Sequence, residues 1–347
     1  MTNLEKIKLF YVKTIILFRL LFIKIFRYII FKEEDYKSFS KILINRDGAF
    51  GDSVVALPSL SIIRQNFPSA KIDLITFSDS GVTFSDLGLK DGLIDNILVR
   101  GKKNRKETLD ELKENRYDLF IQLPQNLGLY KSIRNMFFVR FFLKIKSGFG
   151  WDSGRIKSFI ETQKKYLQIP TETMRLLNNL KHERIIGDVA YPIKEKEPTD
   201  RGIVELLKRN IMVFIIGGKL KTKKWPLDSW IKLANLIGND YEIIIVGGPL
   251  EVKEAEHINS RTKNSHNLCN KLSISELFFV FKRSQMAISN DTGAMHLCDA
   301  AGTNVIGLFS TRELSPKWYP NRRGAIVIEN NINIANITPD NVYNTIK

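Results

Sequence analysis

Residues 41–66 read KILINRDGAFGDSVVALPSLSIIRQN and predict a β-strand, a loop and a helix, in that order. The strand is the short apolar run 41–44, the glycine-containing loop extends from Asn45 to Gly51, and the helix extends from Asp52 to Asn66. Further apolar strands alternate with helical patterns along the chain, at 72–76, 96–99, 119–122, 211–216, 241–246, 286–289 and 304–309. This alternation is typical of α/β proteins built on parallel, doubly wound sheets.

The chain of 347 residues exceeds one typical domain, so two domains are expected. We expect a separate N-terminal segment at 1–40, a Rossmann-like domain at 41–190, a linker at 191–207 and a second Rossmann-like domain at 208–347. Two such halves predict a cleft between them, with ligands at the carboxyl ends of the strands.

The composition is that of a globular protein, with 44% hydrophobic and 26% charged residues, which excludes disordered and collagen-like classes. The formal net charge of +16 favours anionic partners such as nucleic acid, an acidic membrane surface or phosphorylated small molecules. The two cysteines exclude a disulfide framework and favour a reducing cytosol. With four histidines and no metal-type spacing, the sequence predicts neither a metal site nor a cofactor.

The N-terminal stretch 9–31 is apolar and long enough to span a bilayer. Lys13, Arg19, Lys24 and Arg27 interrupt it, however, and each such charge costs about 2.5–3.5 kcal/mol near the bilayer centre. On a helical wheel, Lys13, Lys24 and Arg27 fall within about 60° of one another. This pattern favours an amphipathic helix lying in the membrane interface. A helix packed on the protein's own surface and a true spanning anchor are the alternatives.

Four local motifs carry possible chemistry, and the first is the loop that precedes Asp52. Gly48 and Gly51 allow a tight turn with the backbone close to a ligand. Asp52 stands at the start of a helix, where its carboxylate could accept a proton from a substrate hydroxyl. The alternative is that Asp52 only caps the helix, which aspartate does well.

Two more motifs follow strands in the second half. The loop 219–226, KLKTKKWP, carries four lysines that can neutralise a diphosphate, or that simply face solvent. The turn 247–251, GGPLE, allows a nucleoside to approach at Gly248, and Glu251 could bond ribose hydroxyls. An ordinary strand–helix turn is the alternative for this segment.

The fourth motif, residues 288–296, reads ISNDTGAMH and predicts a strand end, a polar turn and a helix start. Backbone N–H groups at Thr292 and Gly293 suit a phosphate group at the positive end of that helix. Asp291 and Thr292 could instead be simple caps. His296, one turn into the helix, either faces the ligand or is a structural histidine.

Taken together, these segments resemble glycosyltransferase family nine, the heptosyltransferases of lipopolysaccharide core synthesis. The matching stretches are 42–76, 223–234, 243–251 and 288–310, and the last is the most specific. The resemblance implies a GT-B fold, in which two Rossmann-like domains face a cleft and the acceptor binds the N-terminal one. It also implies inverting, metal-independent transfer from a nucleotide-diphosphate sugar, by default ADP-heptose, to a lipid-linked oligosaccharide of the lipopolysaccharide core.

The resemblance also implies roles for single residues in the two halves. The family's Gly-Asp pair falls on Gly51 and Asp52, so Asp52 is the expected catalytic base. The lysine before Trp-Pro falls on Lys223, with Lys224 as the neighbouring possibility, and is expected to contact the diphosphate.

The remaining donor-binding residues follow the later strands. The family's Asp-Thr-Gly falls on Asp291, Thr292 and Gly293, which are expected to hold the donor phosphates and sugar, and the family's histidine falls on His296. Glu251, beside Gly248, matches the acidic residue that contacts the ribose. The loop 46–50 departs from the family's small hydroxylated residues, and residues 1–40 lie outside the match.

A basic patch at 131–165 holds nine basic and two acidic residues, with Phe137, Phe138, Phe141, Phe142 and Phe149 among them. The basic residues are Lys131, Arg134, Arg140, Lys144, Lys146, Arg155, Lys157, Lys164 and Lys165. We expect Arg140, Lys144 and Lys146, together with Arg46, to face the anionic acceptor at the cytoplasmic face of the inner membrane, to which the enzyme binds peripherally. The alternative is a helix whose phenylalanine face is core.

Three other functions fit parts of the pattern. A nucleotide-sugar epimerase shares the GT-B architecture but not the Gly-Asp and Lys-Trp-Pro elements. A nucleic-acid-binding protein would explain the charge, yet no nucleic-acid module is present and the basic residues accompany sugar-nucleotide motifs, so we expect no nucleic-acid partner. A non-catalytic sugar-binding homologue would fit if the departures at 46–50 have disabled acceptor binding.

Overall fold

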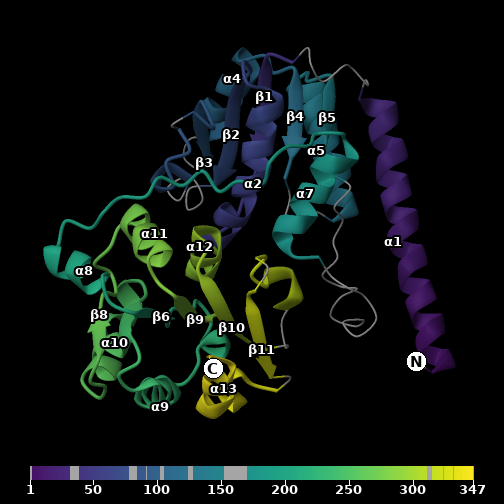
Figure 1. Cartoon of the computed structure of the whole chain (residues 1–347). Coiled ribbons are helices and arrows are strands. Elements are labelled where there is room, and N and C mark those ends of the chain that lie inside the picture. Colours follow the sequence, from purple (N-terminus) through teal and green to yellow (C-terminus); the bar gives the residue numbers. More distant parts are fainter. Residues whose placement is uncertain are drawn as a thin grey trace. The chain divides into compact units, whose positions relative to one another are not determined.

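The computed structural model describes residues 2–31, 39–77, 84–90, 92–101, 105–123, 128–151, 170–310, 315–322, 324–330 and 332–346. The chain forms two compact units, Met1–Pro192 and Ile193–Lys347 (Figure 1). Ile193 and the short helix α8 (Arg201–Leu206) thus belong to the second unit, although both fall in the range 191–207 that we expected to be a linker.

The first unit contains, in its described part, a five-stranded sheet in the order β3-β2-β1-β4-β5. Its strands are β1 (Lys41–Asn45), β2 (Lys71–Phe77), β3 (Asn96–Arg100), β4 (Leu119–Gln122) and β5 (Ser147–Phe149). All four pairings are parallel, and β1 runs beside β2 from Lys41 opposite Lys71 to Asn45 opposite Ile75. Strand β1 is central, so both of its faces are covered and its apolar residues Ile42, Leu43 and Ile44 are buried.

The helices of the first unit lie alongside this sheet (Figure 1). They are α1 (Asn3–Ile30), α2 (Phe50–Asn66), α4 (Arg105–Glu114), α5 (Leu129–Phe137), the π-helical turn η2 (Phe138–Phe142) and α7 (Glu172–His182). Every residue of α2 from Ser53 to Ile63 is buried, which explains its nearly continuous apolar sequence. Helix α2 therefore holds the loop 46–49 rigidly at the carboxyl end of β1.

Helix α1 packs on the first unit through its last turns. Ile23 and Phe31 belong to one buried cluster with Val139 and Trp151, and the rings of Phe31 and Trp151 stack with their centroids 5.0 Å apart. This part of the helix therefore packs on the protein's own surface, which was one of the alternatives for residues 9–31. Within the described residues, no helix combines the length and the apolar character that crossing a bilayer requires.

The second unit contains, in its described part, a six-stranded sheet in the order β11-β10-β9-β6-β7-β8. Its strands are β6 (Ile211–Ile215), β7 (Glu242–Val246), β8 (Ser265–Asn267), β9 (Met286–Asn290), β10 (Asn304–Ser310) and β11 (Ile326–Asn330). All five pairings are parallel. The sequence did not predict β5, β8 or β11, because these edge strands are short or only partly buried and carry a weak apolar pattern.

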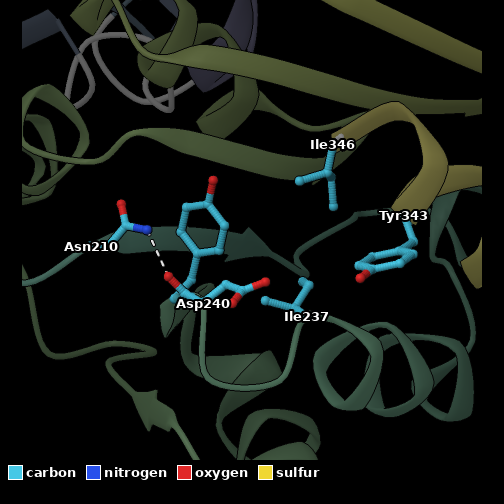
Figure 2. A pocket seen from close by; sticks show the side chains of 6 residues that line it. Asn210, Ile237, Asp240, Tyr343 and Ile346 are labelled. Atoms are coloured by element: carbon cyan, nitrogen blue, oxygen red, sulfur yellow. Dashed lines mark hydrogen bonds between the residues drawn. The ribbon is translucent and has the colours of Figure 1, made fainter.

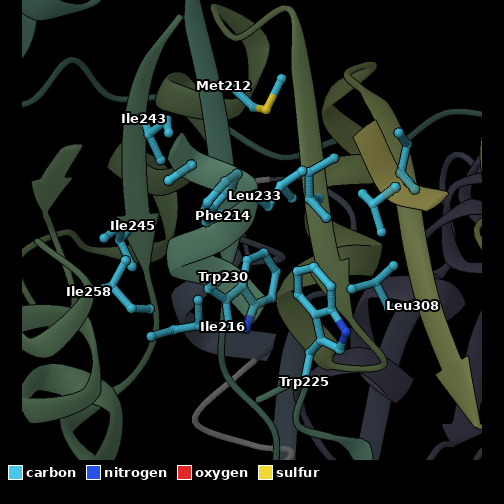
Figure 3. Close-up of a cluster of buried hydrophobic side chains, with 14 of the residues drawn as sticks. Met212, Phe214, Ile216, Trp225, Trp230, Leu233, Ile243, Ile245, Ile258 and Leu308 are labelled. Carbon is cyan, nitrogen blue, oxygen red and sulfur yellow. The ribbon is translucent and has the colours of Figure 1, made fainter. Parts of the chain in front are cut away.

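Helices and short 3-10 turns connect the strands of the second unit. They are α8, η3 (Lys221–Lys223), α9 (Leu227–Ile237), η4 (Pro249–Glu251), α10 (Val252–Asn259), α11 (Ile274–Lys282), α12 (Gly293–Ala301), η5 (Ser315–Trp318), η6 (Ile334–Asn336) and α13 (Pro339–Ile346). Two buried indoles, Trp225 and Trp230, meet edge to face with their centroids 5.0 Å apart (Figure 3). Trp225 also donates from Nε1 to the carbonyl oxygen of Ile337 at 2.8 Å, so the residue after Lys224 is anchored in the core.

The predicted fold class is confirmed: the chain is an α/β protein with two parallel sheets and an N-terminal helix. The predicted strands at 41–44, 72–76, 211–216 and 286–289 coincide with observed strands to within one or two residues.

Candidate active site

Asp52 lies in the first turn of α2, at the carboxyl end of β1. Its Oδ2 accepts a hydrogen bond from the backbone N–H of Ala49 at 2.8 Å, so the capping contact considered above is present. A Cβ on Gly48 would lie 2.2 Å from the Cβ of Asp52, so only glycine leaves room for this side chain. The side chain of Asp52 remains partly exposed. Capping one N–H leaves it lone pairs for a second partner.

Arg46 is the first residue of the loop 46–49 that precedes α2, and it is fully buried. Its guanidinium donates to the carbonyl oxygen of Asp52 at 3.0 Å and lies 3.9 Å from the Asp52 carboxylate. It also donates to Leu123 O at 3.1 Å and to Glu172 Oε1 at 3.3 Å. The structure therefore places Arg46 in the interior, apart from the surface patch in which the sequence analysis grouped it.

Asp47 is a carboxylate of the same loop that the sequence analysis did not single out. Its Oδ2 accepts from Arg100 at 2.7 Å, and Arg100 in turn lies over the ring of Phe77. Burial raises the pKa of Asp47 above its ordinary value, although Arg100 and Arg46 lower it in part. The sequence did not single out Asp47 because it precedes a glycine, and aspartate in an Asp-Gly pair usually only stabilises a turn.

The basic patch is described only from Lys131 to Lys146; Arg155, Lys157, Lys164 and Lys165 lie outside the described residues. Lys144 and Lys146 are exposed, whereas Arg140 is half-buried and donates from Nε to the carbonyl oxygen of Ile30 at 3.0 Å. Among the described phenylalanines of the patch, Phe137, Phe141 and Phe142 are exposed, Phe138 is half-buried and Phe149 is fully buried. Phe138 packs against the buried cluster of the first unit, but the other three rings of α5 and η2 are exposed and do not form a core face.

The second unit brings the other predicted residues together. Loops after β6, β7 and β9 carry them, and these three strands are neighbours in the sheet. Lys223 Nζ lies 2.6 Å from Asp291 Oδ2, and Lys224 Nζ lies 3.2 Å from Glu251 Oε1. The loop 219–226, which we call the lysine loop, is thus held by ion pairs to the loops that follow β9 and β7. It is not a freely solvated segment.

Lys224 also donates to Glu254, a residue of α10 that the sequence analysis did not consider. Burial by itself lowers the pKa of Lys224, but hydrogen bonds to Glu254 and Glu251 outweigh it and raise the pKa above its ordinary value. Lys224 is therefore a firmly protonated cation in a partly buried position.

Glu251 and Thr292 face a common space at the end of β6. A Cβ on Gly217 would lie 3.9 Å both from Glu251 Oε2 and from Thr292 Oγ1, so the bare glycine leaves this space open. Oε2 of Glu251 also accepts from the N–H of Gly248 at 2.9 Å, which fixes the buried carboxylate. Thr292 precedes α12 in extended conformation, and its side chain makes no capping hydrogen bond. Gly293 is the first residue of that helix.

His296 is buried one turn into α12, and its ring meets that of Trp318 edge to face at 6.0 Å between centroids. Asp299, one turn further, accepts from the N–H groups of Asn321 and Arg322 at 2.8 and 3.2 Å. Burial raises the pKa of Asp299. Asp299 thus positions the segment after Trp318, a role that the sequence analysis missed.

Asn290 is the most informative residue that sequence reasoning missed. It is fully buried at the end of β9, and its Nδ2 donates to Ile216 O at 2.8 Å. Its Oδ1 accepts from the N–H of Trp225 at 3.0 Å. Through these hydrogen bonds the amide links the ends of β6 and β9 to the segment just before α9. A polar residue directly before the Asp-Thr-Gly motif was the available signal.

A separate pocket of about 410 Å³ lies beside the amino ends of β6 and β7 (Figure 2). Its lining residues are Asn210, Ile237, Asp240, Tyr241, Tyr343 and Ile346. It contains none of the predicted site residues. Ligands of doubly wound sheets bind at the carboxyl ends, so this pocket is not the candidate site.

Known proteins resemble this chain in sequence and in fold. The chain matches the family model described as glycosyltransferase family 9 (heptosyltransferase) over residues 105–336. Lipooligosaccharide heptosyltransferase 2 of Campylobacter jejuni subsp. jejuni serotype O:6 is 24% identical over 281 residues, which make up 78% of this chain and 81% of that protein.

Two solved structures share the fold. The glycosyl transferase family 9 from Veillonella parvula superposes with a TM-score of 0.65 at 17% identity, covering 90% of this chain and 97% of that one. E. coli heptosyltransferase WaaC with ADP-2-deoxy-2-fluoro heptose superposes with a TM-score of 0.63 at 18% identity, covering 88% and 98%.

Two parallel sheets with polar loops at the carboxyl ends of their strands, together with these structural matches, define an α/β protein of the GT-B class. The chain belongs to glycosyltransferase family 9, the heptosyltransferase family, as its motifs predicted.

Proposed function

We propose that this protein transfers a heptose from ADP-heptose to a lipid-linked acceptor of the lipopolysaccharide core, with inversion at the anomeric carbon and without a metal. The observation that carries the proposal is the assembly of Lys223, Lys224, Glu251 and Asp291 at the ends of three adjacent strands. Family membership and the ADP-heptose analogue bound by the E. coli relative support the choice of donor.

The two lysines suit the diphosphate of the donor. Each is a cation held in place by carboxylates and only partly exposed, so it is less hydrated than a surface lysine. As the bond to the sugar breaks, negative charge grows on the leaving diphosphate. Lys223 and the N–H groups at Thr292 and Gly293 would stabilise that charge, a preorganised role worth about 3–4 kcal/mol per well-placed donor.

Glu251 and Gly248 suit the nucleoside. The Glu251 carboxylate is buried beside the open space at Gly217, and such a carboxylate can accept hydrogen bonds from ribose hydroxyls. Its fixed position reduces the entropy that would be lost on binding.

Asp52 is the proposed general base. It takes the proton of the acceptor hydroxyl while that oxygen attacks the anomeric carbon from the face opposite the diphosphate. The proton ends on the carboxylate, the new glycosidic bond forms, and the old bond breaks with its electron pair leaving on the diphosphate. Because the acceptor is lipid-linked, we place the reaction at the cytoplasmic face of the inner membrane, with the enzyme bound peripherally.

A donor screen tests the proposal. Purified protein is mixed with ADP-heptose, other ADP sugars and UDP sugars, and both thermal shift and transfer to a core acceptor are measured. We expect the largest shift and the only transfer with ADP-heptose, and a product of inverted anomeric configuration. Isomerisation of a donor without any acceptor would point to an epimerase, and donor binding without turnover would point to a non-catalytic homologue.

A further inference from the structure

Helix α1 has two apolar faces, and its own domain covers only one of them. The inner face includes Ile23, Phe26 and Ile30, which pack with the buried cluster around Val139. The outer face lies opposite on the helical wheel and spans about 120°. Its apolar side chains are all exposed: Ile7, Phe10, Tyr11, Leu17, Phe18, Leu21, Ile25, Tyr28 and Ile29.

The outer face continues onto the neighbouring helix through a chain of aromatic rings. Phe22 stacks with Phe26 at 6.2 Å between centroids, Phe26 meets Phe137 edge to face at 5.7 Å, and Phe137 stacks with Phe141 at 5.5 Å. Phe22 and Phe141 at the two ends are exposed. We call the outer face of α1 together with the exposed rings of α5 and η2 the aromatic surface.

Two contacts fix how α1 is turned about its axis. Arg27 forms an ion pair with Glu183, and Arg140 donates from Nε to the carbonyl oxygen of Ile30 at 3.0 Å. These contacts hold the last turns of α1 in a single rotation relative to η2 and to the end of α7, where Glu183 lies. The outer face therefore points away from the part of the domain on which those turns pack.

Basic side chains border the aromatic surface. Helix α1 contains six basic residues and one acidic residue, and exposed Lys6, Lys13 and Lys24 form one edge of its outer face. Arg27 belongs to the stripe expected from the sequence, but it turns to Glu183 instead. Near the far end of the aromatic surface, Arg134, Lys144 and Lys146 are exposed as well.

We propose that the aromatic surface inserts into the headgroup region of an anionic lipid bilayer, with α1 lying in the membrane plane. An apolar face bordered by lysines matches such an interface, because the rings enter the acyl boundary while the ammonium groups meet lipid phosphates. A second copy of this chain is a poorer occupant, since it would bring two sets of like charges together. The proposal specifies how the enzyme binds the membrane, and it does not depend on the identity of the donor sugar.

Vesicle flotation of the full-length protein tests this proposal. We expect strong binding to phosphatidylcholine vesicles that contain 30% phosphatidylglycerol, several-fold weaker binding to pure phosphatidylcholine, and weakening at high salt. The double variant F10D/F18D is expected to lose at least about tenfold in binding to the anionic vesicles, because two exposed rings that would enter the bilayer become negatively charged groups, which anionic lipid repels. Its matched control is L236D/I332D, which adds the same charge at exposed apolar positions of the second unit and should bind like wild type.

Unchanged vesicle binding of F10D/F18D would overturn the proposal. Loss of a dimer in the same variant, with vesicle binding unchanged, would assign the aromatic surface to a second copy. If that variant does not fold, a fluorescent label on L21C replaces it. Cys269 and Cys298 are buried, so the label reaches the new thiol first. A blue shift of the label on anionic vesicles is expected, and no shift would contradict insertion.

A transfer assay separates this proposal from the proposed function. On a soluble, delipidated acceptor, F10D/F18D should be as active as wild type. If the wild-type protein transfers sugar from none of the donors but still binds anionic vesicles, the proposed function is refuted and the membrane proposal is not.

Discussion

The guanidinium of Arg46 lies 3.3 Å from the carboxylate of Glu172, and neither side chain is exposed to solvent. Arg175 also pairs with this carboxylate, at 2.7 Å. The two arginines and the glutamate connect the loop before Asp52 with the first turn of α7. A buried pair of this kind is costly to break, because one partner is left charged without compensation.

Glu172→Gln should therefore destabilise the first unit by about 3 kcal/mol, since two buried arginines lose their countercharge. Urea unfolding measures the change. Glu205→Gln is the matched control, because Glu205 pairs with Lys208 at the exposed surface and should change stability by less than about 1 kcal/mol. Equal effects of the two variants would show that the buried pair contributes nothing beyond a surface pair.

Asp52→Asn should retain donor binding and lose turnover by at least about a hundredfold, because the amide cannot accept a proton. Its Oδ1 can still accept from Ala49 N–H, so the helix cap and the melting temperature should be nearly preserved. Transfer kinetics and thermal shift with donor check both parts. A variant that turns over normally would remove Asp52 from the role of base.

Lys223→Met should weaken binding of ADP by about ten- to a hundredfold, the amount expected for one charge-assisted hydrogen bond. Titration calorimetry with ADP measures this. Lys219→Met is the control from the same loop, because Lys219 is exposed and should matter little. If both variants bind ADP alike, the loop contributes only diffuse charge.

Asn290→Ala should lower the free energy of unfolding of the second unit by about 2–4 kcal/mol, because it leaves the N–H of Trp225 and the carbonyl of Ile216 without their partner. The affinity for ADP should fall too, since the lysine loop loses the hydrogen bond that holds its Trp225 end. Asn264→Ala removes an amide hydrogen bond to Asn239 at the surface, and should cost no more than about 0.5 kcal/mol. Unfolding curves followed by tryptophan fluorescence compare the two.

Glu276 provides a pH dependence with a definite sign. The backbone N–H and hydroxyl of Ser273 hold its carboxylate and lower its pKa below the ordinary value. Its stabilising effect is therefore complete above the pKa of the unfolded chain, about 4.3, and is lost as the pH falls through the lower folded value. Glu276→Gln should cost about 1 kcal/mol at pH 7 and progressively less in acid. A cost that stays constant with pH would rule this account out.

Local patterns along the chain were enough to predict the α/β class and most strands. Ile42 to Ile44 and Ile243 to Val246 form continuous apolar runs because central parallel strands are buried on both faces. The motifs that we propose to bind the donor were also visible, because each directly follows such a strand. Strands β5 and β8, three residues each, were not visible, because so short an edge strand has no periodicity to detect.

The sequence by itself determined the fold class and the family, and it indicated the loops that we propose to carry the chemistry, because strand burial and turn chemistry depend on near neighbours in the chain. Only the tertiary structure decided which partners those loops acquire. Arg46 is separated from Glu172 by 126 positions, and Asn290 is separated from Ile216 by 74. Whether an arginine is a surface cation or a buried support depends on such distant contacts, which no local pattern encodes. The same holds for α1, where packing decided which of two apolar faces is closed by the protein and which is left exposed.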